Sequence, residues 1–393
     1  MGFGTTTGSG HGFTATGRIS PYFEGVQRVG AGGYTRHLCT YVPWQFPQDP
    51  LEQYRALTER VTLWDTACER QIQIRGKDAI AFADRLVTRD LSRLGPGRGT
   101  YTFVCDDDGR IIGDPVLLVV DAETVWLSIS STDLALWAKG IAIGSGAAVV
   151  VDEAPVATLQ LQGPKSRDTL RKLTPYPIDE LRYFRCARTT VAGIDAVISR
   201  TGWTAELGYE IYPYGSRPHP WGREQGMRLW DAILEAGAEH GIMVTPFLTT
   251  RGVEGGLCVF NNLQGEDLNP LEFWRENLVD LDAGDFIGRA ALRAIRDAGG
   301  PARRMVGLKA LDAAATLERG EWDLPVLVDG VEVGSTRRYV QSPALDRTIA
   351  LAVLGRDYIQ PGQRVRVEHP GGFTDMEVTT LPFIDSEGRR ARS

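Results

Sequence analysis

The chain has 393 residues and a net charge of −7 at pH 7, with 42% hydrophobic and 24% charged residues. Such a composition is typical of a soluble globular protein with two or three domains. A nucleic-acid surface is not expected, because no block of Lys and Arg stands out. No run of about 18 apolar residues is present that could span a membrane.

Cysteine and histidine usage argues against disulfides and metal sites. The five cysteines contain no C-x-x-C pair, so the sequence predicts a reducing compartment, the cytoplasm. The histidines show no zinc spacing, so no metal is expected. Residues 1–19 are rich in Gly, Thr and Ser and lack a basic start followed by an apolar run. They predict a disordered tail rather than a secretory signal.

The first predicted domain is an α+β region over residues 20–152. Apolar residues recur at helical spacing in three segments, and alternation or β-rich composition marks four others. The turn DDDG at 106–109 predicts a hairpin between two of the strands. The expected helices are 51–63, 77–94 and 131–142, and the expected strands are 70–75, 100–105, 110–120 and 124–130.

A second α+β region is expected over residues 153–300, followed by an all-β domain over 303–388. Residues 213–226 are rich in Pro and Gly and predict a surface loop, and residues 295–303 predict a linker. Short strands separated by turns after residue 303 predict a barrel or a sandwich. In the second region the expected strands are 158–163, 186–193, 195–200 and 208–213, and the expected helices are 164–173 and 227–241.

Two carboxylates stand inside predicted strands. Glu210 lies in SRTGWTAELGYEIY (199–212), where it must face water or a specific partner, because burying an unpaired charge is costly. Asp114 interrupts the apolar strand 110–120 and is followed by Pro115, which has no N–H group. This pattern predicts an edge or a bulge, where side chains are redirected into sites.

Motifs spread from about residue 20 to residue 385 resemble the folate-dependent aminomethyltransferase family, that of the glycine-cleavage T-protein. Within this family the chain is most similar to the dimethylsulfoniopropionate demethylase group. The family motifs are GTYTFVCDDDGRIIGDPVLLVV, LQLQGPKSRDTL, SRTGWTAELGYEIY, EGGLCVFNN, DFIGRAAL and SPALDRTIALAVL, and the closer likeness lies in GYTRHLCTYVP, LWDTACERQIQIRGKDA, RDLSRLGPGR and LWAKGIA.

The resemblance implies a three-domain, clover-like α+β fold with ferredoxin-like sheets, a C-terminal β-barrel and tetrahydrofolate in the centre. The region 153–300 is expected to bind folate and to interleave with the first region. The resemblance assigns catalytic roles to Asp114 and Tyr101. It places the pterin's amino-pyrimidine edge on Glu210, which accepts paired hydrogen bonds. The other positions matched to folate contacts are Trp203, Tyr183, Phe184 and Ser130.

Other candidate residues lie where this chain departs from the T-protein. Leu248 and Gly252 stand where the T-protein has arginines, so Arg251 is the candidate to replace them in contacting folate, and the departure puts either the folate-tail contacts or the substrate in doubt. Glu69 and Arg70 lie in a run that replaces a DVSHMG-like motif, and they are candidates for the donor pocket, with an exposed ion pair as the alternative. Trp44 and Tyr41 are candidates to hold a cationic donor by cation–π attraction, with a core or surface role as the alternative.

The predicted function is a tetrahydrofolate-dependent demethylase. It would move a methyl group from a small donor, a sulfonium such as dimethylsulfoniopropionate or an N- or O-methyl compound, to give 5-methyltetrahydrofolate. An O-methyl donor would need a proton donor, for which Tyr101 or Tyr209 could serve. Alternatives are a glycine-cleavage aminomethyltransferase and a non-enzymatic folate-binding protein, whose KGCYxGQE-like motif is missing. The only expected partner is the small donor, and a homodimer is left open.

Overall fold

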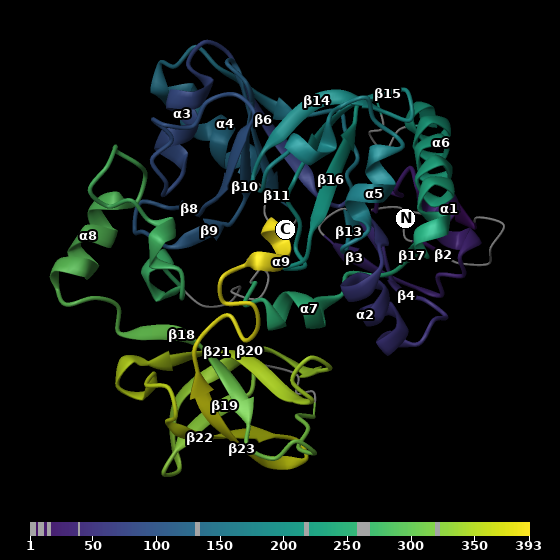
Figure 1. Cartoon of the computed structure of the whole chain (residues 1–393). Coiled ribbons are helices and arrows are strands. Elements are labelled where there is room, and N and C mark those ends of the chain that lie inside the picture. Colours follow the sequence, from purple (N-terminus) through teal and green to yellow (C-terminus); the bar gives the residue numbers. More distant parts are fainter. Residues whose placement is uncertain are drawn as a thin grey trace.

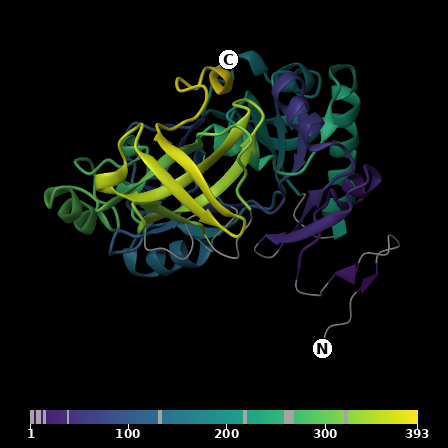
Figure 2. The same cartoon turned by 90° about the horizontal axis from the view of Figure 1, so that it is seen from below.

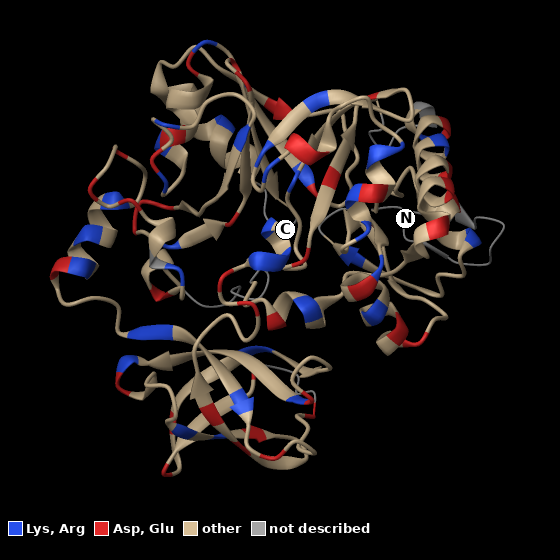
Figure 3. Cartoon of the chain, viewed as in Figure 1, with Lys and Arg blue, Asp and Glu red and all other residues tan. Residues whose placement is uncertain are grey.

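The computed structural model describes residues 5–6, 12–13, 17–37, 40–129, 134–215, 220–257, 268–318 and 323–393. It has three lobes: two sheets with their helices side by side, and a β-barrel below them (Figure 1). Figure 2 shows the barrel from below, with the N-terminal segment at the side of the second lobe. Acidic and basic residues are interspersed over all three lobes (Figure 3).

The first lobe is a five-stranded antiparallel sheet in the order β12-β6-β11-β10-β7. Helices α3 (Ala79–Leu86) and α4 (Leu134–Ser145) pack their apolar residues against this sheet. The expected helix 77–94 ends early, at Leu86, because the next residue is already extended. The strands are β6 (Arg70–Arg75), β7 (Arg98–Tyr101), β10 (Val116–Asp121), β11 (Thr124–Ile129) and β12 (Val150–Glu153).

The predicted hairpin is present, but both of its strands are broken. Short strands β8 (Val104–Cys105) and β9 (Ile111–Gly113) pair next to the turn, and β7 pairs with β10 beyond it. The expected continuous strands 100–105 and 110–120 are therefore wrong in detail. The break in the second one falls at Asp114–Pro115, since proline cannot donate to the ladder.

The second lobe is a six-stranded sheet in the order β14-β15-β16-β13-β5-β17. Strand β5 (Thr62–Asp65) precedes the first lobe in sequence but pairs with β13 here. The expected helix 51–63 is wrong at its end, because α2 (Pro50–Glu59) stops before this strand. The other strands are β13 (Leu159–Gln162), β14 (Cys186–Val191), β15 (Ile194–Ser199), β16 (Gly208–Pro213) and the parallel β17 (Met243–Val244).

Helices and an N-terminal hairpin pack against the second sheet. Helix α6 (Pro220–Gly237) begins inside the expected surface loop 213–226, so the loop prediction is wrong for residues 220–226. Residues 216–219 lie outside the described part of the chain. The other elements here are α1 (Phe23–Arg28), α5 (Ser166–Arg171), η1 (Ile178–Glu180), η2 (Ala238–His240), β3 (Gly33–His37) and β4 (Thr40–Gln45). In the predicted tail 1–19, only the pair β1 (Thr5–Thr6) and β2 (Gly12–Phe13) and residues 17–19 are described.

The third lobe is a closed six-stranded barrel. Of the two predicted alternatives, the barrel is therefore confirmed and the sandwich is wrong. The elements leading to it are α7 (Thr249–Glu254), η4 (Pro270–Glu272), η5 (Glu276–Leu278) and α8 (Arg289–Asp297), the last of which occupies the start of the expected linker 295–303. The barrel strands are β18 (Arg303–Ala310), β19 (Pro325–Val328), β20 (Val331–Ser342), β21 (Arg347–Gly355), β22 (Arg364–His369) and β23 (Gly372–Thr379), with η6 (Arg356–Tyr358) between them.

Contacts between the lobes surround the centre of the molecule. Trp126 of the first sheet packs against Tyr212 of the second, with ring centroids 5.6 Å apart. Phe103 and Phe273 belong to an apolar cluster that joins the first lobe to the barrel. After the barrel the chain turns back, and α9 (Arg389–Arg392) lies near the second sheet (Figure 1). The backbone N–H groups of Phe383 and Ile384 donate to the carbonyl of Glu254.

Two kinds of feature are absent from the described residues: a membrane-spanning helix and a cluster of metal-ligating side chains. None of their helices has the length and apolar character needed to cross a bilayer. Within the same residues, no three His, Cys, Asp or Glu side chains are grouped so that they could hold a metal ion.

Candidate active site

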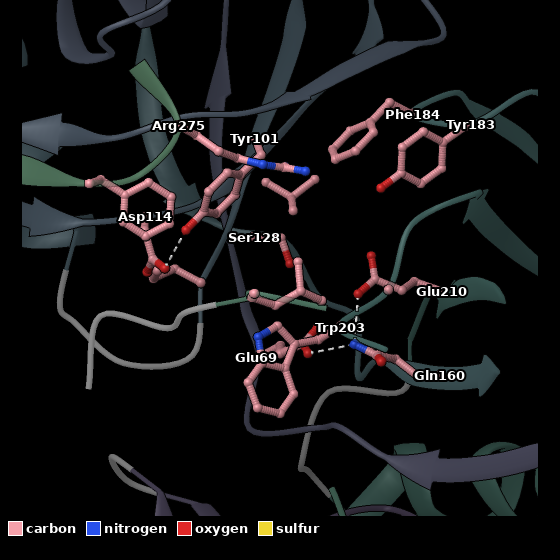
Figure 4. A pocket seen from close by; sticks show the side chains of 16 residues that line it. Glu69, Tyr101, Asp114, Ser128, Gln160, Tyr183, Phe184, Trp203, Glu210 and Arg275 are labelled. Atoms are coloured by element: carbon pink, nitrogen blue, oxygen red, sulfur yellow. Dashed lines mark hydrogen bonds between the residues drawn. The ribbon is translucent and has the colours of Figure 1, made fainter. Parts of the chain in front are cut away.

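A cavity lies where the three lobes meet. It has about 850 Å³ of space between its lining atoms, part of it open to solvent. Its lining comes from both sheets and from the segments that lead to the barrel (Figure 4). The lining residues are Glu69, Tyr101, Asp114, Val116, Ser128, Ile129, Gln160, Tyr183, Phe184, Gly202, Trp203, Glu210, Gly256, Leu257, Phe273 and Arg275.

Glu210 lies in the middle of β16 and is only 4% exposed. Its Oε2 atom accepts hydrogen bonds from the hydroxyls of Thr201, Tyr212 and Ser199, with Tyr212 at 2.7 Å. Its Oε1 atom accepts from Gln160 Nε2 at 2.8 Å. Burial raises the pKa of Glu210, and these four hydrogen bonds act in the opposite direction because they favour the charged form.

Gln160 connects Glu210 to a second carboxyl group. It sits opposite Glu210 in the β13–β16 register, and its Nε2 atom also donates to Glu69 Oε1 at 2.9 Å. Burial, and then the nearby Glu210, raise the pKa of Glu69 well above its usual value. Three buried polar atoms of the cavity lining have no hydrogen-bond partner in the described structure: Glu69 Oε2, Gln160 Oε1 and Trp203 Nε1. Buried polar groups normally have partners, so these three atoms are exceptions at this end of the cavity.

Asp114 and Tyr101 lie at the other end of the cavity in Figure 4. Tyr101 is the last residue of β7, and its hydroxyl donates to Asp114 Oδ2 at 2.9 Å. Asp114 is 8% exposed and occupies the strand break that Pro115 imposes. Phe103 packs on the Tyr101 ring at 5.7 Å. A carboxylate is thus held in place beside apolar side chains, where charge interactions are stronger than in water.

Aromatic side chains form much of the wall between the two ends. The rings of Tyr183 and Phe184 meet edge to face at 4.7 Å. Phe184 has a φ of 55°, which is uncommon for a non-glycine residue. Its N–H donates to Arg200 O, and its carbonyl accepts from Gly99 N in the first lobe. The two backbone hydrogen bonds hold this conformation at the junction of the sheets.

Gly252, where the T-protein pattern has an arginine, lies close to the ring of Trp203. A Cβ atom on Gly252 would lie 3.0 Å from the Cη2 and Cζ2 atoms of the Trp203 indole. A larger side chain at position 252 would therefore have to displace the ring. Gly252, which departs from the T-protein pattern, thus allows the Trp203 ring to pack close to the backbone.

The structure does not bring every predicted residue into the cavity. Arg251 is 1% exposed and donates to Glu206 and Glu254, so its guanidinium is held in an ion-pair network outside the lining. Arg70 pairs with Glu153 at 3.2 Å and also lies outside it. Trp44, on β4, is 57% exposed. The positions of these three residues do not support their predicted roles in folate or donor binding within this cavity.

The remaining predicted residues divide into three groups. Ser130 lies outside the described residues. Tyr41 does not line the cavity, and Tyr209 is fully buried in the core of the second lobe, where its hydroxyl receives a hydrogen bond from Arg167. The structure brings seven of the predicted residues together around the cavity: Glu69, Tyr101, Asp114, Tyr183, Phe184, Trp203 and Glu210.

Sequence reasoning missed several lining residues. Gln160 had a signal, because LQLQ alternates and one of its polar residues must face across to Glu210. Ser128, in β11, accepts a hydrogen bond from Gln71 at 2.9 Å. Arg275, whose guanidinium lies 4.7 Å from the Trp274 ring centre, had no local signal. Phe273 could be placed only by the contact between lobes.

Known proteins are similar to this chain over most of its length. Residues 27–283 match the GCVT N-terminal domain, and residues 303–385 match the glycine cleavage T-protein C-terminal barrel domain. The dimethylsulfoniopropionate demethylase DmdA of Ruegeria pomeroyi is 32% identical, over 92% of this chain and 96% of that protein. An aminomethyltransferase of Moorella thermoacetica is also 32% identical, over 85% and 89%.

A solved structure shares the fold. The glycine cleavage system aminomethyltransferase T from Bartonella henselae superposes with a TM-score of 0.82 at 20% identity, over 93% of this chain and 98% of that one. Together with the closed barrel, this match confirms the predicted fold class, α+β sheets with a C-terminal β-barrel in the three-domain arrangement.

Proposed function

The chain belongs to the glycine cleavage T-protein family, and from this premise we propose that it is a tetrahydrofolate-dependent demethylase acting on a small methylated donor. The membership confirms the family predicted from the sequence and, with it, an enzyme class of one-carbon transferases that use tetrahydrofolate. The methyl donor is the part of the proposal that needs an experiment, because relatives with two different activities are equally identical to this chain.

The observation that carries the proposal is the contrast between the two ends of the cavity. One end offers the Glu210 carboxylate with unpartnered polar atoms beside it, and the other offers Asp114 held by Tyr101. Aromatic side chains line the space between them. This set of groups fits a flat ring with a polar edge, because the carboxylate accepts from ring N–H and amino groups while the aromatic faces contact the ring.

When bound, tetrahydrofolate supplies the amine that accepts the one-carbon group. Glu210 and Gln160 would hold the polar ring edge, and Trp203, Tyr183 and Phe184 would contact the ring and the segment next to it. Asp114 would orient the amine by a hydrogen bond and stabilise positive charge that develops there. Tyr101 keeps the Asp114 carboxylate in position for that task.

The donor side of the proposal rests on the run from Asp65 to Arg70. This run replaces the DVSHMG-like motif of the T-protein, and the structure places one of its residues, Glu69, in the cavity lining. A departure at this position therefore bears on what the cavity accepts. The aromatic lining also suits a cationic donor such as a sulfonium, since each favourable ring contact contributes roughly 0.5–2 kcal/mol.

A donor panel tests the proposal. The protein and tetrahydrofolate would be incubated with dimethylsulfoniopropionate, glycine betaine, dimethylglycine and vanillate, each carrying a deuterated methyl group. Mass spectrometry would look for labelled 5-methyltetrahydrofolate. We expect label from one donor class. Replacing Asp114 by Asn should lower that rate by about 100-fold or more while leaving folate affinity within about fivefold, because Asp114 acts on developing charge.

A matched control lies at the end of the strand that follows Asp114. Asp121 ends β10 and forms an exposed ion pair with Arg188, so Asp121→Asn should keep the full rate. Folate binding without label from any donor would contradict the demethylase. Methylenetetrahydrofolate formed from an aminomethylated lipoyl carrier protein would support the aminomethyltransferase, the activity that the Moorella thermoacetica relative is named for. Binding with neither product would favour a non-enzymatic role.

A further inference from the structure

The chain returns from the barrel to the centre of the molecule and ends its described part there. We call residues 385–393 the strap. Its helix α9 lies over the centre of the view in Figure 1, and Figure 2 shows it at the outer edge of the molecule. The strap starts from a fixed point, because the N–H groups of Phe383 and Ile384 donate to the carbonyl of Glu254 at 3.0 and 3.2 Å.

A second cavity, which we call the side cavity, lies between the strap and the loop 201–208. It has about 660 Å³ of space between its lining atoms, part of it open to solvent. The strap therefore bridges a space at this place instead of filling it with side chains. The side cavity adjoins the central one, because four residues line both: Tyr183, Gly202, Leu257 and Arg275.

Polar contacts hold the strap on the second lobe. Arg390, whose side chain is 54% exposed, forms an ion pair with Glu206 at 3.1 Å. Arg200 donates to the carbonyl of Ala391 at 3.3 Å and to that of Ser393. Arg167 also donates to the Ser393 carbonyl. Of the residues 385–393, Ala391 alone is buried, so apolar burial contributes little to holding the strap in place.

The strap also contacts a wall of the central cavity. The guanidinium carbon of Arg392 lies 6.0 Å from the ring centre of Tyr183, which lines both cavities. Helix α9 has four residues and is far shorter than helices that are stable by themselves. Segments with few buried apolar contacts open more easily than the core of a protein. The strap is therefore expected to detach while the three lobes stay folded.

We propose that the strap covers a side entrance to the central cavity and opens to let the ligand in and out. When it detaches, the side cavity loses one wall, and the four residues shared by the two cavities become accessible from that side. Arg390 is then a positioning residue, since its ion pair with Glu206 holds the strap closed. The inference rests on the proposed function for its ligand, tetrahydrofolate.

Two substitutions on the same helix test the strap. Arg390→Ala removes the ion pair with Glu206. Arg389→Ala is the matched control, because it removes the same charge from the same helix, but its side chain is 78% exposed and pairs with the exposed Glu387. The association and dissociation rates of tetrahydrofolate would be measured by stopped-flow fluorescence under anaerobic conditions.

We expect both rates to rise about three- to fivefold in Arg390→Ala, the size expected for the loss of a partly exposed ion pair. The Kd should stay within about twofold, because opening precedes entry and exit alike. Hydrogen exchange without ligand gives a second measurement. The amide of Arg392, which donates to the Gly388 carbonyl, should exchange faster by the same factor as the two rates, since it exchanges from the open strap. Arg389→Ala should match the unaltered protein in all three measurements.

Other outcomes would overturn the inference. Faster dissociation with unchanged association would mean that Arg390 holds the ligand instead of the strap. Faster exchange with both rates unchanged would mean that the strap opens but the ligand enters elsewhere. Unchanged exchange and unchanged rates would mean that the ion pair does not hold the strap closed. A lack of tetrahydrofolate binding by the unaltered protein would remove the proposed function and the entrance with it, whereas the other results leave the proposed function intact.

Discussion

Two buried clusters of charged residues lie close to the centre of the molecule, and they differ in how their charges are balanced. In the Arg251 cluster, the guanidinium donates to Glu206 and Glu254, and Glu254 also accepts from Tyr54 and Ser342. In the Glu210 cluster, no described cation pairs with Glu210 or Glu69, and two polar atoms of Glu69 and Gln160 have no partner among the described residues.

The difference distinguishes a cluster that links parts of the fold from a cluster in the cavity lining. The Arg251 cluster joins α7 to α2 and to barrel strand β20, so its hydrogen bonds hold lobes together. It is satisfied internally and needs no ligand. The residues of the Glu210 cluster line the cavity, and two of their buried polar atoms are unpartnered within the described residues. Arg251, a predicted folate contact, thus belongs to the cluster that links the lobes, whereas Gln160, which carries no motif, belongs to the cavity lining.

The largest expected effect is on stability, and it comes from Arg251→Met. This change leaves Glu254 buried without its cation and Glu206 with only the exposed Arg390. We expect a loss of about 3 kcal/mol or more in the free energy of unfolding, because breaking a buried ion pair strands the remaining charge. Urea denaturation measures it. Tetrahydrofolate affinity of the folded variant should change by less than about threefold.

Glu210→Gln should show the reverse pattern, with a small effect on stability and a large effect on tetrahydrofolate affinity. It removes a charge that no cation balances, so unfolding free energy should fall by less than about 1 kcal/mol or even rise. Tetrahydrofolate affinity should drop by about 50-fold, since charge-assisted hydrogen bonds are lost. If Glu210→Gln destabilised the protein as much as Arg251→Met and bound folate normally, the distinction between the two clusters would be wrong.

A smaller effect is expected at Asp65, a third buried carboxyl. It lies in β5 outside the cavity lining, and Ala67 N donates to it at 3.1 Å. Burial raises the pKa of Asp65 to about 6, against the hydrogen bonds from Ser20 and Ala67. The folded state therefore binds this proton more tightly than the unfolded state, whose carboxyl titrates near its usual value of about 4.

The sign of the pH dependence follows from this difference. The contribution of Asp65 to stability is most favourable below about pH 4, is lost as the pH rises through about 6, and stays unfavourable above that. Asp65→Asn removes this dependence. Its stability relative to the unaltered protein should increase by about 1 to 2 kcal/mol between about pH 5 and pH 7.5 in urea titrations. No relative change over this range would show that the side chain is ionised and well solvated.

The smallest effects are expected outside both clusters. Trp44→Ala should change tetrahydrofolate affinity by less than about twofold, because this indole is 57% exposed and does not line the cavity. Trp203→Ala should weaken binding by about tenfold, since its ring belongs to the lining. Quenching of protein fluorescence by the ligand would compare the two. A larger effect of Trp44→Ala than of Trp203→Ala would indicate that the hairpin of β3 and β4 contacts the ligand.

The sequence alone indicated most of the strands and singled out Asp114 and Glu210, and the resemblance to the T-protein family pointed to the other five predicted residues that line the cavity. Alternation and turn residues are local signals, so strands such as 70–75 and 124–130 could be predicted from neighbouring residues. Asp114 was recognisable because a polar residue before Pro115 breaks an apolar strand. Glu210 was recognisable because a carboxylate inside a strand requires a partner.

Only the tertiary structure decided which charges meet. Arg251 is separated by 45 residues from Glu206, and Glu69 by 91 from Gln160, so no local pattern could pair them. Strand β5 belongs to the second sheet, where it pairs with β13, and the chain leaves for the first lobe only after it. Glu69 lies in the segment between β5 and β6, and Gln160 of β13 connects it to Glu210. Periodicity specifies which way a side chain points from its own strand, whereas its partner depends on how distant strands and lobes pack. For this protein, that packing separates the arginine that holds the lobes together from the carboxyls that face the cavity.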